Sequence, residues 1–135
     1  MIDRGRAGLL CLSSLMCLAA CSPSAPPQEN APFEPVYEGI DTRLLDGDLV
    51  SFQVRMRGAR DTEDVRRYAD CAAAQYALIR GFGYARHLRT TTDATSGLWQ
   101  ADAVYTISAE RPAGLLVLNA DDVVAGCRAE GVPTV

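Results

Sequence analysis

The sequence contains no lysine: all 13 basic residues are arginine, and 17 acidic residues bring the formal net charge to −4. Binding to nucleic acid requires cations that neutralise phosphates, so we expect no nucleic-acid partner. Histidine occurs once, as His87, and no Cys-x-x-Cys pair or calcium-binding loop is present. These absences argue against a zinc or calcium site, and we expect neither a metal nor another cofactor.

Long hydrophobic runs are also absent. The apolar run from Ala7 to Ala20 is interrupted by Ser13 and Ser14, whereas a membrane-spanning helix needs roughly 20 mostly apolar residues. Arg4 and Arg6 precede this run. A basic start, a short apolar segment and small residues at its end are typical of a secretory signal peptide, which we assign to residues 1–20.

The signal ends in Leu18-Ala19-Ala20-Cys21, which resembles the bacterial lipobox. The resemblance implies cleavage before Cys21, a diacylglyceryl group on its thiol and a further acyl chain, such as palmitate, on the new amino terminus. Several chains on one residue give stable membrane attachment, whereas one gives only marginal binding. Ser22 in the next position favours the outer membrane, with the protein facing the periplasm. The alternative is an ordinary secreted protein in which Cys21 is incidental.

Removal of the signal leaves about 115 residues, the size of one ordinary domain. Residues 21–35 are rich in proline and small polar residues, a composition typical of a flexible, partly extended tether. We therefore place a single domain at residues 36–135.

Two cysteines remain in this domain, Cys71 and Cys127. In an oxidising compartment such a pair tends to form a disulfide. The alternative is two buried thiols that act as small hydrophobic residues.

The pattern of the domain predicts several strands. Asp46-Gly47-Asp48 separates residues 37–45 from 49–57, and Asp-Gly between such runs is a strong hairpin signal. A strand over 82–91 followed by a loop over 92–97 is also expected, and Leu115–Leu118 is a candidate for a short buried strand. Alternation of apolar and polar residues predicts two half-buried strands, with inward positions Val50, Phe52, Val54 and Met56 in one and Trp99, Ala101, Ala103, Tyr105 and Ile107 in the other.

Two helices are predicted. The first covers residues 61–80, with Asp61 as N-cap and Asp64 in the capping-box position. Its apolar stripe has helical spacing and consists of Val65, Tyr68, Ala69, Ala72, Tyr76 and Ile79. The second helix covers 120–130, with Asn119 as N-cap.

This order of elements predicts an α+β two-layer sandwich, with a mainly antiparallel sheet and two helices on one face. Cys71 and Cys127 would meet if the two helices pack side by side on the sheet.

The segment from Tyr37 to Tyr84 resembles a family of small uncharacterised proteobacterial lipoproteins. The matching stretches are Tyr37-Glu38-Gly39, Val54 to Gly58, Arg67-Tyr68 with Ala73-Ala74-Gln75, and Gly81-Phe82-Gly83-Tyr84. Gln75 stands where the family has glutamate, and Ala77 where it has threonine. The resemblance implies an envelope lipoprotein with an α+β domain, and these departures argue against transferring an activity.

An enzyme would have to use His87, because it is the only histidine available for acid–base work. Asp102 is a candidate to orient it, with Cys71 or Ser108 as nucleophile, and all three groups must be in contact. No nucleophile motif is present, Cys71 lies in the middle of a predicted helix, and His87 lies between Arg86 and Arg89. We therefore interpret His87 as a surface residue and expect no catalytic residues.

Arg55, Arg57, Arg86 and Arg89 are expected to share the solvated face of the sheet. They would form either a patch for an anionic cell-wall or envelope partner or an ordinary charged surface. The sequence as a whole predicts a non-enzymatic structural or partner-binding domain, attached to the membrane by its lipid. The alternatives are a small periplasmic enzyme using His87 and an inhibitor of a cell-wall hydrolase.

Overall fold

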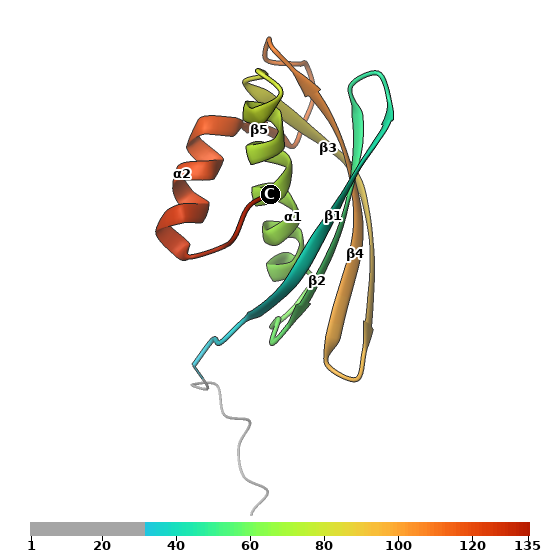
Figure 1. Cartoon of the computed structure of the whole chain (residues 1–135), viewed down its shortest axis with the longest axis vertical. Helices are drawn as coiled ribbons and strands as arrows, with labels where there is room; N and C mark the ends of the chain where they lie inside the picture. The colour runs from blue at the N-terminus through green and yellow to red at the C-terminus, as the bar shows by residue number, and fades with distance from the viewer. Residues whose placement is uncertain (1–31) are drawn as a thin grey trace, which may run out of the picture. The chain divides into compact units, whose positions relative to one another are not determined.

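The structure, a computed structural model, describes residues 32–135 (Figure 1). The predicted signal peptide (1–20), the predicted lipidation site Cys21 and most of the predicted tether (21–35) lie outside the described residues.

Five antiparallel strands form one sheet in the order β1-β2-β4-β3-β5. The strands are β1 (Val36–Asp46), β2 (Leu49–Arg57), β3 (Tyr84–Thr95), β4 (Leu98–Ser108) and β5 (Val117–Asn119). The two helices, α1 (Thr62–Ile79) and α2 (Ala120–Glu130), lie on the same side of this sheet (Figure 1). The predicted α+β class with a mainly antiparallel sheet is therefore confirmed.

The core lies between the sheet and α1, and the predicted alternation places residues in it correctly. Val50, Phe52, Val54 and Met56 of β2 are fully buried, and Ala101, Ala103, Tyr105 and Ile107 of β4 are buried opposite or beside them. Trp99 is partly buried against the same core. The opposite side of the sheet, which we call the open face, carries the polar residues of the same strands, such as Gln53 and Gln100.

Helix α1 begins as predicted at the N-cap Asp61, whose Oδ1 accepts hydrogen bonds from the backbone N–H of Glu63 at 2.9 Å and of Asp64 at 3.3 Å. The capping-box prediction is wrong in one detail. The Asp64 carboxylate accepts from the backbone N–H of Arg60 at 2.8 Å, one residue before the N-cap, because it also binds the Arg60 guanidinium.

The buried surface of α1 is wider than the predicted stripe. Ile79, expected to face the core, is 61% exposed, because it lies in the last turn of the helix. Residues off the stripe are buried instead: Asp70, Cys71, Ala73, Ala74 and Ala77. The reason is that α1 lies between the sheet and α2, so that two of its sides are covered (Figure 1).

Helix α2 has the predicted bounds. The Asn119 side chain accepts from the backbone N–H of Asp122 at 3.1 Å, and Gly131 closes the helix in the left-handed region at φ 71°. The helix packs on α1 and on the end of β5. The two helices are therefore neighbours as predicted, with α1 rather than α2 covering most of the sheet (Figure 1).

The predicted loop at 92–97 and the predicted buried strand at Leu115–Leu118 both differ from the structure. Most of the expected loop 92–97 belongs to β3, which extends to Thr95 and leaves Ser96 and Gly97 as the turn; the β-branched threonines of this segment favour a strand. Leu115 and Leu116 are 86% and 58% exposed rather than buried. Leu116 has a φ of 57°, a left-handed conformation outside the β region of backbone angles, and β5 starts after it.

Candidate functional site

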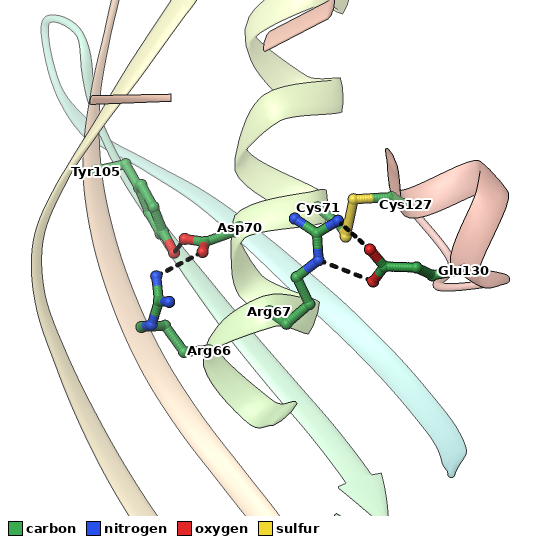
Figure 2. The surroundings of a disulfide bond; sticks show 7 residues. All are labelled: Arg66, Arg67, Asp70, Cys71, Tyr105, Cys127 and Glu130. Atoms are coloured by element: carbon green, nitrogen blue, oxygen red, sulfur yellow. Dashed lines mark hydrogen bonds and ion pairs between the residues drawn. A yellow bond between two sulfur atoms is a disulfide. The ribbon is translucent and has the colours of Figure 1, made fainter. Parts of the chain in front are cut away.

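A disulfide joins the middle of α1 to the last turn of α2 (Figure 2). The bridge connects Cys71 and Cys127, whose Cα atoms are 5.9 Å apart, and both residues are fully buried. The fold thus places at bonding distance the two cysteines that the sequence leaves in the domain. That the bond forms in the cell remains a prediction, because it depends on an oxidising compartment.

An ion pair lies beside the disulfide and joins the same helices. Arg67 of α1 donates two hydrogen bonds to the Glu130 carboxylate, at 2.9 and 3.1 Å (Figure 2). The two side chains are 31% and 55% exposed, and exposed pairs contribute at most about 1 kcal/mol. The ion pair therefore adds little to the covalent link that the disulfide makes between α1 and α2.

A buried polar cluster lies on the other side of α1, facing β4. Asp70 is 3% exposed; its Oδ1 accepts from the Tyr105 hydroxyl and its Oδ2 from Arg66 Nη1, both at 2.7 Å (Figure 2). Arg66 also binds Glu63 at the surface. The Arg66 guanidinium therefore pairs with the buried Asp70 carboxylate on one side and reaches the surface on the other. A buried charge is tolerated when it is paired and hydrogen-bonded in this way.

Burial sets the titration behaviour of this cluster. Desolvation raises the pKa of Asp70, and the Tyr105 hydroxyl and Arg66 oppose that rise. Desolvation also raises the pKa of Tyr105, with the Asp70 charge as the second cause, so the phenol stays protonated and donates. Because both carboxylate oxygens of Asp70 accept hydrogen bonds from residues of the same chain, we interpret the cluster as a structural part of the core.

His87 is half-buried at the edge of this cluster rather than on the surface. Its ring meets the Tyr105 ring edge-on with centroids 5.2 Å apart, and its Nε2 is 2.7 Å from Thr90 Oγ1. Its Nδ1 is buried and has no hydrogen-bond partner among the described residues. The register explains this placement, because His87 pairs with Tyr105 and so shares its helix-facing side.

The groups that an enzyme would have to combine are kept apart. Asp102 points to the open face, where it accepts from Ser51 Oγ at 2.7 Å, so it does not orient His87. Cys71 is held in the disulfide, and the Ser108 hydroxyl donates to the Glu110 carbonyl at 2.8 Å. No nucleophile–base pair results from the residues that the sequence singled out.

The four arginines do share the open face, as their partners in the sheet register show. Two of them have acidic partners: Arg55 Nη1 lies 2.7 Å from Asp41 Oδ2, and Arg57 Nε lies 2.8 Å from Glu38 Oε1. A hollow of about 360 Å³ on this face is lined by both signs of charge, including Asp102. Neutralisation of these two arginines favours an ordinary charged surface at Arg55 and Arg57 over an anion-binding patch.

A larger groove, of about 730 Å³, lies where the start of β1 meets the ends of the helices. Arg60 lies over the Phe33 ring, 3.9 Å from its centroid, and also binds Asp64. Arg67, on the other wall, binds Glu130. Both arginines that line the groove within residues 32–135 are paired with carboxylates, so this part of the chain offers no free cation there to select an anionic ligand.

Among residues 32–135, no group of three or more histidine, cysteine, aspartate or glutamate side chains is placed to hold a metal ion. Within the same part of the chain, no helix has both the length and the apolar character needed to cross a membrane.

The sequence patterns did not predict that Asp70, Arg66 and Tyr105 form one hydrogen-bonded cluster. One signal was available: Asp70 is an acidic residue directly followed by Cys71 and three alanines in the middle of the main helix, and Arg66 lies one turn before it, at the spacing of a helical ion pair. The contact with Tyr105 depends on how the sheet is placed against the helix, which the local pattern does not contain.

Comparison with known proteins gives two matches. Residues 37–131 match the family model described as the YNQ4 C-terminal domain. The chain is also 36% identical over 85 residues to an uncharacterised 26.9 kDa protein of Paracoccus denitrificans from the region 5′ of nqo8. The match covers 63% of this chain but 33% of that protein, so the chain spans about a third of the length of this relative. No solved structure matches the chain.

Proposed function

The chain belongs to the family of the YNQ4 C-terminal domain, and on that premise we propose that this member is a lipid-anchored, non-enzymatic lipoprotein of the bacterial cell envelope that binds a protein partner. The anchor is the thiol of Cys21, and the domain faces the periplasm, on the outer rather than the inner membrane.

The proposal rests on one observation: the geometry of Cys71 and Cys127 suits a disulfide, and the predicted location outside the cytoplasm is one in which disulfides form. Cys71 and Cys127 lie 5.9 Å apart at Cα, in the range that a disulfide requires. Such bonds persist in oxidising compartments and are rare in the cytosol. The Leu18–Cys21 motif independently supports export of the domain to such a compartment.

The non-enzymatic part of the proposal rests on the separation of the candidate catalytic groups. Asp102 lies on the opposite face of the sheet from His87, and in the structure the sulfur of Cys71 is bonded to that of Cys127. The buried carboxylate of Asp70 is satisfied by Tyr105 and Arg66. These contacts support a binding or structural role over acid–base or nucleophilic chemistry.

The anchor is tested by producing the full chain in a bacterial host grown with a labelled palmitate analogue. We expect the label on the wild-type chain, its loss in Cys21→Ser, and its retention in the matched variant Cys17→Ser, which changes a cysteine of the predicted signal. An unlabelled wild-type chain, or label that survives Cys21→Ser, contradicts the proposed anchor.

A further inference from the structure

Strand β1 forms one edge of the sheet and pairs only with β2 among the described strands. Every residue from Asp41 to Asp46 is exposed, and Leu44 and Leu45 are each 48% exposed. An exposed edge strand offers unpaired backbone N–H and C=O groups to another chain, and such edges are usually protected by charges, prolines or bulges.

The bulges in β1 are confined to its ends. Irregularities in the pairing with β2 lie between Tyr37 and Gly39 and between Leu44 and Asp46, and bulges of this kind twist an edge away from further pairing. The stretch between them, Gly39–Leu44, is in regular register with β2. A regular stretch of edge, exposed from Asp41 to Leu44, is therefore available for backbone pairing.

The side chains of this stretch alternate between the two faces. Asp41 and Arg43 pair with Gln53 and Ser51 of β2 and so lie on the open face. Ile40, Thr42 and Leu44 pair with buried β2 residues and so lie on the helix side. Arg43 has no ion-pair partner in the described part of the chain.

We propose that β1 binds β1 of a second copy of this chain, antiparallel and around a two-fold axis at Thr42. In this register Asp41 lies opposite Arg43 of the second copy, and the reverse pair forms by symmetry. Ile40 likewise lies opposite Leu44. Opposite charges and apolar residues in directly facing positions are the pairs that stabilise antiparallel strands.

Charge also excludes the neighbouring registers. The nearest registers that keep both open faces on one side have the axis one residue away, at Asp41 or at Arg43. The first places Asp41 opposite Asp41, and the second places Arg43 opposite Arg43, and like charges in facing positions are destabilising. In the proposed register Asp41 lies between Arg55 of its own sheet, at 2.7 Å, and Arg43 of the second copy.

This inference rests on the proposed partner-binding role and names the partner as a second copy. Pairing along one short strand is a small interface, of the kind that makes weak and transient contacts. Confinement of two lipid-anchored copies to one membrane raises their effective concentration, so a weak contact suffices.

The test is cross-linking of full-length chain in its host membrane by a cysteine at the axis. Facing residues of antiparallel strands have Cβ atoms about 4.5–5.5 Å apart, and a small approach brings them to the roughly 3.5–4.5 Å of a disulfide. We expect Thr42→Cys to give a covalent dimer on mild oxidation and Thr91→Cys, an exposed threonine of β3, to give none. Absence of the Thr42→Cys dimer, a disulfide from this cysteine to another protein, or an equal yield from Thr91→Cys overturns the proposal.

A charge exchange tests the register. In the Thr42→Cys background, Asp41→Arg and Arg43→Asp should each lower the dimer yield about tenfold, because each turns two attractive pairs into repulsive ones. The double exchange should restore the yield when it is combined with Arg55→Glu, because residue 41 then keeps an oppositely charged neighbour in its own sheet. Failure of this combined variant to restore the yield overturns the register. Palmitate labelling of the same samples is read separately, so that loss of the dimer with retained label refutes only the pairing, and loss of the label refutes the anchor.

Discussion

Replacing Tyr105 by phenylalanine tests the reasoning about the core most directly. The variant removes one hydroxyl and keeps the ring that packs edge-on against Phe52, with centroids 5.8 Å apart. Asp70 then loses the donor at 2.7 Å and keeps only Arg66. The perturbation thus isolates one hydrogen bond to a buried carboxylate.

The expected magnitude follows from burial and charge. A hydrogen bond to a charged group contributes about 1.5–3 kcal/mol, and a buried acceptor left without a partner costs a similar amount. Because Asp70 is 3% exposed, water cannot replace the hydroxyl freely. We expect Tyr105→Phe to lower the free energy of unfolding by about 2 kcal/mol.

The effect should depend on pH with a definite sign. Burial raises the folded-state pKa of Asp70 above its unfolded value, so charged Asp70 lowers stability at neutral pH, and this cost is relieved as the pH falls through the folded-state pKa. Loss of the Tyr105 hydroxyl removes a contact that lowers this pKa, and so raises it further. The difference between wild type and Tyr105→Phe should therefore shrink as the pH falls through the pKa of Asp70.

The assay is urea unfolding with the disulfide intact, and Tyr76→Phe is the matched control. The Tyr76 ring also meets Phe52 edge-on, at 5.7 Å, but its hydroxyl accepts from Arg80 at the surface. The control should change stability by less than about 0.5 kcal/mol. Equal stability of Tyr105→Phe and wild type, or equal losses in both variants, would refute the argument that the hydroxyl supports a charged Asp70.

Two further predictions concern covalent and backbone constraints. Thiol labelling of unfolded, unreduced protein should leave Cys71 and Cys127 unmodified, and quantitative labelling of both cysteines refutes the disulfide. The Cys71→Ala/Cys127→Ala variant should be less stable by about 4 kcal/mol, the chain-entropy estimate for so long a loop. Gly58→Ala should destabilise more than Gly47→Ala in the same urea assay. Both glycines have positive φ, but a Cβ at position 58 would lie 2.7 Å from the Glu34 carbonyl oxygen, whereas position 47 is open; equal losses would contradict this contact.

Local sequence signals predicted most of the secondary structure because they act over a few residues. Asp-Gly at 46–47 places the first hairpin, and the caps Asp61 and Asn119 start the helices where the structure has them. The failures also have local causes. Ile79 continues the apolar period but lies in the last turn of α1, and Leu116 is apolar but has a left-handed backbone.

The candidate site was harder to predict, because its contacts join positions far apart in the chain. Tyr105 and Asp70 are separated by 35 residues, and only the packing of α1 on β4 brings them together. The β3 register turns His87 toward Tyr105 and away from Asp102. A shift of one residue in strand register moves a side chain to the other face, so no sequence pattern alone decided which acid lies near the histidine.

The sequence by itself determined the class of fold, the ends of both helices and the pair of cysteines in the domain. It also gave the expectation of lipid attachment to a membrane at Cys21. These depend on periodicity, capping and composition, which neighbouring residues specify. The tertiary structure alone decided that Asp70 is buried with two partners, that Arg55 and Arg57 are neutralised, and that β1 is an open edge. Those facts depend on strand order and on the stacking of α1 between the sheet and α2, which bring together residues with no relation in the sequence.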